Sequence, residues 1–131
     1  MLEVRGISAG YGSFGVLHDL SLTVAPGQFV GILGRNGVGK TTLLKMIAGA
    51  VRPQHGEVLF NGRGYADAAE TARSGVALVL DRKGIFRSLS VLDNLRLALR
   101  LHRNRPQQWS LDDVLGMFPR LAERRHAPGG G

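Results

Sequence analysis

The segment Gly34-Arg-Asn-Gly-Val-Gly-Lys-Thr41, followed by Thr42, determines how the rest of the chain is interpreted. It matches the phosphate-binding pattern G-x-x-x-x-G-K-[ST]. An apolar run at 28–33 precedes it, and residues 43–48 carry apolar side chains at helical spacing. The motif therefore has the strand, the glycine-rich loop and the helix start that it requires. We interpret it as a loop that binds the phosphates of a nucleotide.

The residue types in this loop suit an anion. Glycines let the backbone curl so that successive N–H groups point at one phosphate, and the following helix adds its partial positive charge. Lys40 reaches the β- and γ-phosphates, and the Thr41 hydroxyl can ligate Mg²⁺. The alternative is an accidental glycine-rich turn, which a random chain of this length contains with a probability on the order of one in a hundred. The residues predicted to contact the nucleotide here are Gly34, Asn36, Gly37, Gly39, Lys40, Thr41 and Thr42.

The composition indicates a soluble globular domain. The 131 residues are enough for one domain with a sizeable core, and 44% of them are apolar. The longest apolar runs are far shorter than the roughly 18 residues that a membrane-spanning helix needs. The chain has no cysteine, which excludes disulfides and thiolate metal sites. A strand pattern begins directly at Met1, so we expect no signal peptide and a cytoplasmic location.

The positive charge is concentrated in the second part of the chain. The net charge is +7, of which residues 1–81 carry +1 and residues 82–131 carry +6. A basic surface of this kind can bind nucleic acid or an anionic membrane. A solvated arginine-rich helical surface is the alternative, and we favour it because no aromatic residues alternate with the arginines. We therefore do not expect nucleic acid as a partner.

Apolar and polar residues alternate at 2–7 and 16–24, which predicts two half-buried strands that we expect to be antiparallel. A short strand at 57–60 ends on the turn pair Asn61-Gly62. We therefore expect an antiparallel β subdomain around the phosphate loop.

Fully apolar runs at 29–33 and 76–80 predict two central strands of a parallel sheet. No later aliphatic run ending in Asp follows them, although a phosphate-loop domain needs more parallel strands than two. We interpret the fold as α/β with an incomplete sheet.

Ser90 and Asp93 resemble a capping box at the start of a helix, and Arg103-Asn-Arg-Pro106 breaks that helix. The tail 127–131 has the composition of a linker. The other helices are expected from Lys40 to about Gly49, over 65–73 and over about 111–118.

Taken in order, these features resemble the nucleotide-binding domain of ABC transporters. Tyr11 occupies the place of the aromatic residue that stacks on adenine, and Pro26-Gly27 leads into the strand before the phosphate loop. Asn61-Gly62 lies where the antiparallel subdomain turns. Residues 80–95 resemble the loop that links the core to the helical subdomain, followed by the T-V-x-E-N-L helix start. The resemblance implies an ABC-type P-loop NTPase fold.

Three segments are most similar to the ATP-binding subunit of branched-chain amino acid importers and of the related urea and amide systems. They are Tyr11-Gly-Ser-Phe-Gly-Val-Leu-His18, Gly34-Arg-Asn-Gly37 and Gly84-Ile-Phe86. The resemblance implies ATP and Mg²⁺ as ligands, and a second nucleotide-binding subunit and transmembrane permease subunits as partners. It also implies a location on the inner face of the cell membrane. ATP binding and hydrolysis in the full-length dimer would then power transport.

The resemblance also implies a division of the chain. Residues 1–131 form one partial nucleotide-binding domain in this interpretation. Residues 1–89 are the catalytic-core portion with the β subdomain, 90–126 begin the helical subdomain, and 127–131 are a glycine-rich tail.

Asp81 departs from the family pattern, which usually has Gln at this position and often Glu in the branched-chain group. The resemblance implies that Asp81 contributes to the Mg²⁺ site together with Thr41, since carboxylate oxygens are suitable ligands. One methylene fewer than Glu leaves room for a bridging water. The alternative is an ordinary loop aspartate beside Arg82 and Lys83.

Several family elements are missing from this sequence. It contains no L-S-G-G-Q signature, no aliphatic strand ending in Asp-Glu and no switch histidine, and we expect it to be the N-terminal portion, ending before the signature. The catalytic glutamate belongs to the missing strand, so we assign no catalytic residue. The histidines that do not fit the switch position are His18, His55, His102 and His126.

Two other interpretations compete with an importer subunit. A small kinase or GTPase also carries a phosphate loop, but it rarely places two strands and a Tyr loop before it, and a GTP-specific N-K-x-D motif is absent. The second alternative is a degenerate, non-catalytic nucleotide-binding module or a nucleic-acid-associated ABC module.

We predict that the 131-residue chain binds nucleotide without hydrolysing it, because it carries a phosphate cradle but no glutamate placed to polarise water. Phosphate release from MgATP by the purified chain should stay at the level of the Lys40→Ala variant. Turnover well above background that is lost in Lys40→Ala would contradict this prediction.

Overall fold

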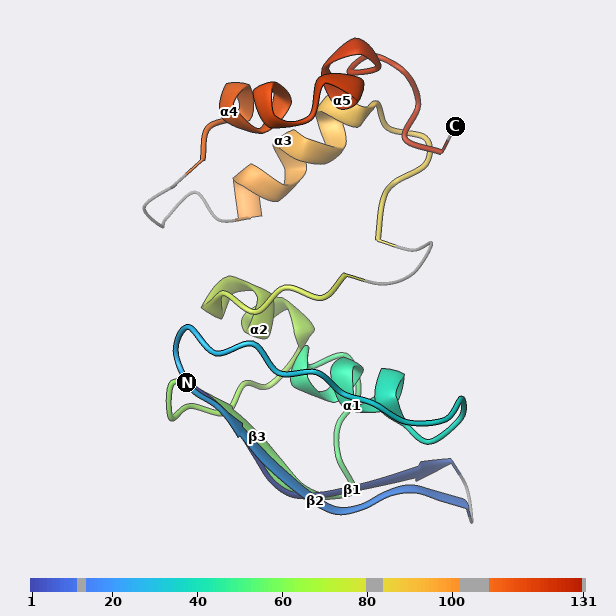
Figure 1. Ribbon diagram of the computed structural model, residues 1–131, viewed down its shortest axis with the longest axis vertical. Coiled ribbons are helices and arrows are strands. Elements are labelled where there is room, and N and C mark those ends of the chain that lie inside the picture. The colour runs from blue at the N-terminus through green and yellow to red at the C-terminus, as the bar shows by residue number, and fades with distance from the viewer. Residues whose placement is uncertain (12–13, 80–83, 102–108, 131) are drawn as a thin grey trace. The chain divides into compact units, whose positions relative to one another are not determined.

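The structure is a computed structural model that describes residues 1–11, 14–79, 84–101 and 109–130. These residues form two compact units, an N-terminal unit (Met1–Leu78) and a C-terminal unit (Val79–Gly131), which we describe separately. Figure 1 shows the elements of each unit. Within the described ranges, no helix is long and apolar enough to cross a membrane.

The N-terminal unit contains a three-stranded antiparallel sheet in the order β2-β1-β3. Its strands are β1 (Leu2–Tyr11), β2 (Phe14–Val24) and β3 (His55–Phe60). Val4 lies opposite Leu22 on one side and Val58 on the other, so apolar side chains gather around the middle of the central strand. The predicted antiparallel strands are therefore confirmed, and β1 extends beyond its predicted end at residue 7.

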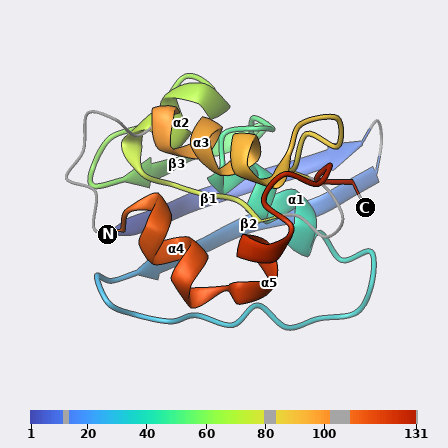
Figure 2. The ribbon, with the colours of Figure 1, turned by 90° about the horizontal axis from the view of Figure 1, so that it is seen from above.

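Helix α1 (Lys40–Ile47) covers one face of this sheet, as Figures 1 and 2 show from two directions. Leu43 and Met46 are only 2% and 3% exposed, and they pack into one buried cluster with Val4, Ile7, Ala9 and Leu17 of the sheet. Each buried aliphatic side chain of this size contributes about 1.5–3 kcal/mol. This cluster fixes the position of α1 above the strands.

Gly49, just after the end of α1, lies against a second helix, α2 (Ala68–Ser74). The Asp67 side chain caps α2 by accepting a hydrogen bond from the Glu70 amide at 2.7 Å. A Cβ atom at Gly49 would lie 2.5 Å from the Thr71 hydroxyl and 2.9 Å from the Asp67 carbonyl oxygen. Thr71 is itself buried. The chain therefore needs a residue without a side chain where it leaves α1.

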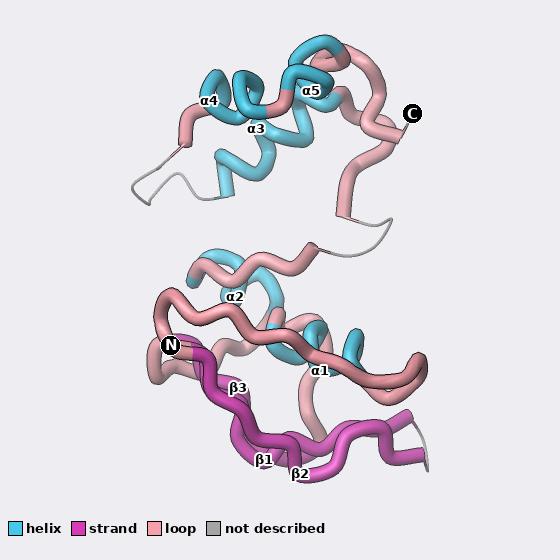
Figure 3. Tube along the Cα trace, in the orientation of Figure 1, coloured by secondary structure: helices cyan, strands magenta, loops and turns pink. Residues whose placement is uncertain are grey.

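The two predicted parallel strands are not formed. Residues 29–33 lie in the loop between β2 and α1, and residues 76–79 have no regular structure, while residue 80 lies outside the described ranges (Figure 3). Phe29, Leu33 and Val79 are 97%, 95% and 93% exposed. A fully apolar run becomes a strand only where neighbouring strands pair with it and layers cover both of its faces. The described residues supply neither to these two segments.

The C-terminal unit contains three helices, α3 (Val91–Leu101), α4 (Leu111–Met117) and α5 (Pro119–Glu123). The predicted cap of α3 is confirmed, because the Ser90 hydroxyl accepts a hydrogen bond from the Asp93 amide at 3.0 Å. Helix α5 was not predicted. Pro119 ends α4 as expected, but its fixed φ also suits the first turn of a new helix. The predicted helix break at 103–106 lies outside the described residues.

The tail of the chain is hydrogen-bonded to the segment that leads into α3. The Ala127 carbonyl oxygen accepts from the Val91 amide at 3.0 Å, and the Gly129 amide donates to the Leu89 carbonyl oxygen at 2.8 Å. Composition alone suggested a linker for 127–131, because glycine-rich sequences are usually flexible. Backbone groups make these bonds, so the amino-acid types reveal little about them.

At two glycines, substitution by alanine should change the stability in opposite directions. Gly56 has φ 78°, and a Cβ atom there would meet the backbone carbonyls of Arg5 and Gly6. Gly116 lies inside α4 with open space around it. We expect Gly56→Ala to lower the free energy of unfolding by more than about 1 kcal/mol and Gly116→Ala to raise the stability of α4 by roughly 0.5–1 kcal/mol. Urea denaturation followed by circular dichroism tests the pair, and changes of the same sign would contradict it.

Helix α4 begins with a capping box. The Ser110 hydroxyl accepts from the Asp113 amide at 3.1 Å and donates to the Asp113 carboxylate at 2.6 Å, and the Ser110 amide donates to the same carboxylate at 2.8 Å. The Ser110 hydroxyl, followed by the Ser110 amide, lowers the pKa of Asp113. A lowered pKa means that the ionised carboxylate stabilises the helix above its unfolded-state pKa, and that this support is lost as the pH falls through the lowered value.

We predict that Ser110→Ala raises the Asp113 pKa toward its ordinary value and weakens α4, typically by about 1 kcal/mol. NMR titration of the Asp113 carboxyl and hydrogen exchange of the first α4 amides measure both effects. Ser88→Ala, an exposed serine of the same unit, is the control. An Asp113 pKa that is the same in wild type and Ser110→Ala would disprove the assignment.

Candidate nucleotide site

The last residues of the loop between β2 and α1 have a backbone that depends on glycine. Gly37 and Gly39 have φ of 86° and 99°, in the left-handed region that side chains disfavour. Gly39 is also buried, and a Cβ atom there would lie 2.8 Å from side-chain carbons of both Val16 and Leu17. It caps α1, with its carbonyl oxygen accepting from the Leu43 amide at 2.8 Å. The glycine at 39 is therefore required both by backbone conformation and by contact with β2.

A pocket of about 320 Å³ opens at the start of α1. The structure brings six of the predicted nucleotide-contacting residues together around it, and β2 adds a seventh residue. The lining residues are Val16, Asn36, Gly37, Gly39, Lys40, Thr41 and Thr42.

The Lys40 ammonium group folds back over its own loop. Its Nζ atom donates to the Gly34 carbonyl oxygen at 2.7 Å and to the Arg35 carbonyl oxygen at 2.6 Å. Gly34 does not line the pocket, and it is connected to the site through this bond. Because an ammonium group has three N–H donors, a bound phosphate can take the third or replace a carbonyl. The Lys40 ammonium group therefore connects two backbone carbonyls of the loop and places one positive charge there.

The first turn of α1 presents unpaired donors and no competing acid. The first amides of a helix lack intrahelical acceptors, and the helix dipole places partial positive charge there. The first turn of α1 contains no acidic residue. Thr41 is exposed and Thr42 is half-buried at this end. The electrostatics of the pocket consequently favour an anion.

The chemistry of Thr41 fits a Mg²⁺ ion that is held mainly by phosphate and water. Hard cations of this kind take oxygen ligands and are commonly bound by one or two protein groups together with substrate phosphates. Among the described residues, no group of three or more His, Asp or Glu side chains could hold a metal by itself. The exposed Thr41 hydroxyl is adjacent in sequence to Lys40 and lines the same pocket.

Val16 was missed by the sequence analysis. It lies on β2 and reaches the pocket because the start of this strand runs beside Gly39. The phosphate-loop motif does not include it, and alternation in the strand indicates only that some side chains are buried. Only the packing of α1 on the sheet places Val16 in the site.

Two predicted site residues cannot be placed with their side chains. Tyr11 is the last residue of β1, where it pairs with Phe14 across the hairpin, and its side chain is outside what the structure describes. Asp81 lies outside the described residues. His18, His55 and His126 are exposed, and His102 lies outside the described ranges.

Comparisons with known proteins agree on one family. The family model described as "ABC transporter" matches residues 17–127. The sulfate/thiosulfate import ATP-binding protein of Pectobacterium atrosepticum is 34% identical over 76% of this chain and 30% of its own length. The Escherichia coli intermembrane phospholipid transport system ATP-binding protein is 33% identical over 81% of this chain and 41% of its own length. The chain thus spans less than half the length of these relatives.

Solved structures confirm the predicted fold class. The ATP-binding subunit of an ABC transporter superposes with a TM-score of 0.80 at 31% identity, over 97% of this chain and 53% of its own. A dimeric ATP-binding cassette bound to ADP and phosphate has a TM-score of 0.77 at 20% identity, over 98% of this chain and 62% of its own, which supports the fold alone. Together with the family match over residues 17–127, these similarities show that the chain belongs to the ABC transporter family.

Proposed function

We propose that this chain binds ATP through the pocket at the start of α1. The observation that carries the proposal is the set of loop residues around Lys40, with left-handed glycines at 37 and 39 and an acid-free first helical turn. The chain's membership of the ABC transporter family supports a nucleoside triphosphate as the ligand.

The chain's own residues bind and orient the nucleotide. The loop amides and the Lys40 ammonium hold the phosphates, and Asn36, Thr41 and Thr42 line the space around them. Mg²⁺ supplies charge neutralisation when it is bound, with Thr41 as a ligand and Asp81 as the second residue that we assign to it. Tyr11 provides a stacking surface for adenine, an interaction worth on the order of 1–3 kcal/mol per base.

In the full-length protein, we assign the chain to the ATP-binding subunit of an ABC importer. Two such subunits would dimerise and act on transmembrane permease subunits at the inner face of the membrane. The relatives named for sulfate/thiosulfate import and for phospholipid transport support a transport role. In this assignment residues 1–89 and 90–126 belong to the core and helical portions of one domain, and 127–131 are its glycine-rich tail.

The proposed cargo is a branched-chain amino acid or a related amide. This assignment rests on the three sequence segments at 11–18, 34–37 and 84–86. The two relatives described above are named for sulfate/thiosulfate import and for phospholipid transport, so they add no support for an amino acid as the cargo. Transport assays with the complete system, comparing leucine with sulfate, would decide between these cargo classes.

We predict that Lys40→Ala weakens MgATP binding about tenfold or more, because a charge-assisted hydrogen bond contributes roughly 1.5–3 kcal/mol. Calorimetric titration of the 131-residue chain with MgATP measures the change. Lys45→Ala is the matched control, since Lys45 lies on the same helix and does not line the pocket. Equal affinities for wild type and Lys40→Ala would refute nucleotide binding at this loop.

A further inference from the structure

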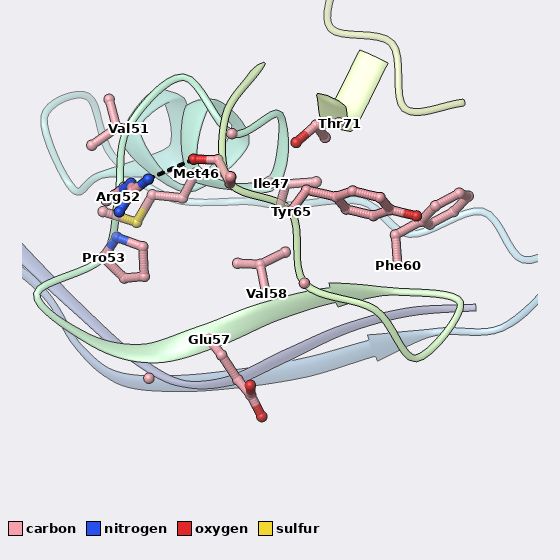
Figure 4. A pocket seen from close by; sticks show the side chains of 14 residues that line it. Met46, Ile47, Val51, Arg52, Pro53, Glu57, Val58, Phe60, Tyr65 and Thr71 are labelled. Atoms are coloured by element: carbon pink, nitrogen blue, oxygen red, sulfur yellow. Dashed lines mark hydrogen bonds between the residues drawn. The ribbon is translucent and has the colours of Figure 1, made fainter. Parts of the chain in front are cut away.

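A second pocket, of about 450 Å³, lies at the other end of α1. Met46 and Ile47 from the last turn of α1 line it, together with Val58 and Phe60 of β3 and the loop residues Arg52 and Tyr65 (Figure 4). It shares no lining residue with the nucleotide pocket. We call it the β3 pocket. Its volume is within the roughly 300–1,000 Å³ that is typical of small-molecule sites.

The body of the β3 pocket is apolar and aromatic. Met46 is 3% exposed, and Val58, Phe60 and Tyr65 are half-buried. In Figure 4 the rings of Tyr65 and Phe60 lie at one end of the pocket, while Arg52 lies at the opposite end beside Pro53. An elongated ligand with an apolar group at one end therefore matches the distribution of side chains.

The charge at the Arg52 end is positive. The Arg52 guanidinium donates to the Ala66 carbonyl oxygen at 2.7 Å, which uses one of its five N–H donors. Among the ion pairs of the described residues, none includes Arg52. The pocket's acidic residue, Glu57, points away in Figure 4 and pairs with Arg5 at 3.3 Å. A planar guanidinium with free donors is suited to bidentate recognition of a carboxylate.

We propose that the β3 pocket is a binding site for a small aromatic carboxylate. The ring of the ligand would lie against Tyr65 and Phe60, its chain would follow Met46 and Val58, and its carboxylate would bind Arg52. The hydroxyl of Thr71, the buried polar side chain of the lining, already donates to the Asp67 carbonyl oxygen at 2.8 Å and adds no demand for another partner. This site goes beyond nucleotide binding and does not depend on it.

The test uses 4-phenylbutyrate and its uncharged amide, 4-phenylbutanamide, titrated calorimetrically into the 131-residue chain. We expect the acid to bind and the amide to bind about tenfold or more weakly, because the amide lacks the charge that Arg52 recognises. Arg52→Gln should weaken binding of the acid by a similar factor and leave binding of the amide nearly unchanged. Arg63→Gln, an exposed arginine of the same unit outside the lining, should bind the acid as wild type does.

A second set of variants tests the apolar body of the pocket. Val58→Phe should fill the pocket and abolish binding of the acid, with folding checked by circular dichroism. If that variant unfolds, Gly64→Leu replaces it, because a Cβ atom at Gly64 has no neighbour closer than 3.7 Å. Loss of acid binding in the folded filling variant and in Arg52→Gln supports the site.

The proposal is overturned by no binding of the acid at millimolar concentration, by equal binding of the acid to wild type and Arg52→Gln, or by binding that survives filling of the pocket. Binding that is lost only in Phe29→Ser would place the ligand on the exposed apolar run and would also overturn it. The Lys40→Ala variant distinguishes the two sites, since it should weaken binding of MgATP and leave binding of the acid unchanged.

Discussion

The packing of Leu43 and Met46 on the three-stranded sheet is the interaction on which the N-terminal unit depends. These two side chains lie about five sixths of a helical turn apart on α1 and enter the same cluster as Val4 and Ile7. Because this contact fixes the helix, it also fixes both of its ends. The start of α1 is held beside β2 and lines the pocket that we propose for the nucleotide, and its last turn lines the β3 pocket.

The glycine-rich loop before α1 is constrained by the strand beside it and by its own lysine. Gly39 must take a left-handed conformation and must also avoid Val16 and Leu17, so the loop is constrained by the sheet beneath it. Lys40 meanwhile satisfies two backbone carbonyls of the same loop. A positive side chain held in this way lowers the ordering cost of binding an anion, since fewer groups have to be immobilised at that moment.

The two units are stabilised in different ways. The N-terminal unit has a buried cluster of side chains from the sheet and α1. In the C-terminal unit, none of the described side chains is fully buried. Local interactions dominate there instead, including the caps at Ser90 and Ser110 and the backbone hydrogen bonds that the tail donates to Leu89 and accepts from Val91. Such interactions contribute about 1 kcal/mol each, so this unit has little stability of its own to lose.

The sequence by itself determined the features that depend on residues close together in the chain. The Ser90 cap, the pairing of β1 with β2 and the start of α1 follow from spacing and residue type, and each was predicted near its observed place. The family followed from the order of these motifs. In each case the interacting groups are within a few residues of one another, or in adjacent strands whose pattern of alternation fixes which side is buried.

Only the tertiary structure decided the features that depend on distant partners. The apolar runs at 29–33 and 76–80 were predicted as strands, but the structure has no strand at 29–33 or 76–79, because strand formation requires neighbours that a single segment does not contain. Val16 lines the pocket at the start of α1, and Arg52 lines the β3 pocket at the other end of the helix. Both positions follow from the packing of α1 on the sheet. Burial and pairing are properties of the surroundings of a residue, and for these residues the surroundings come from other parts of the chain.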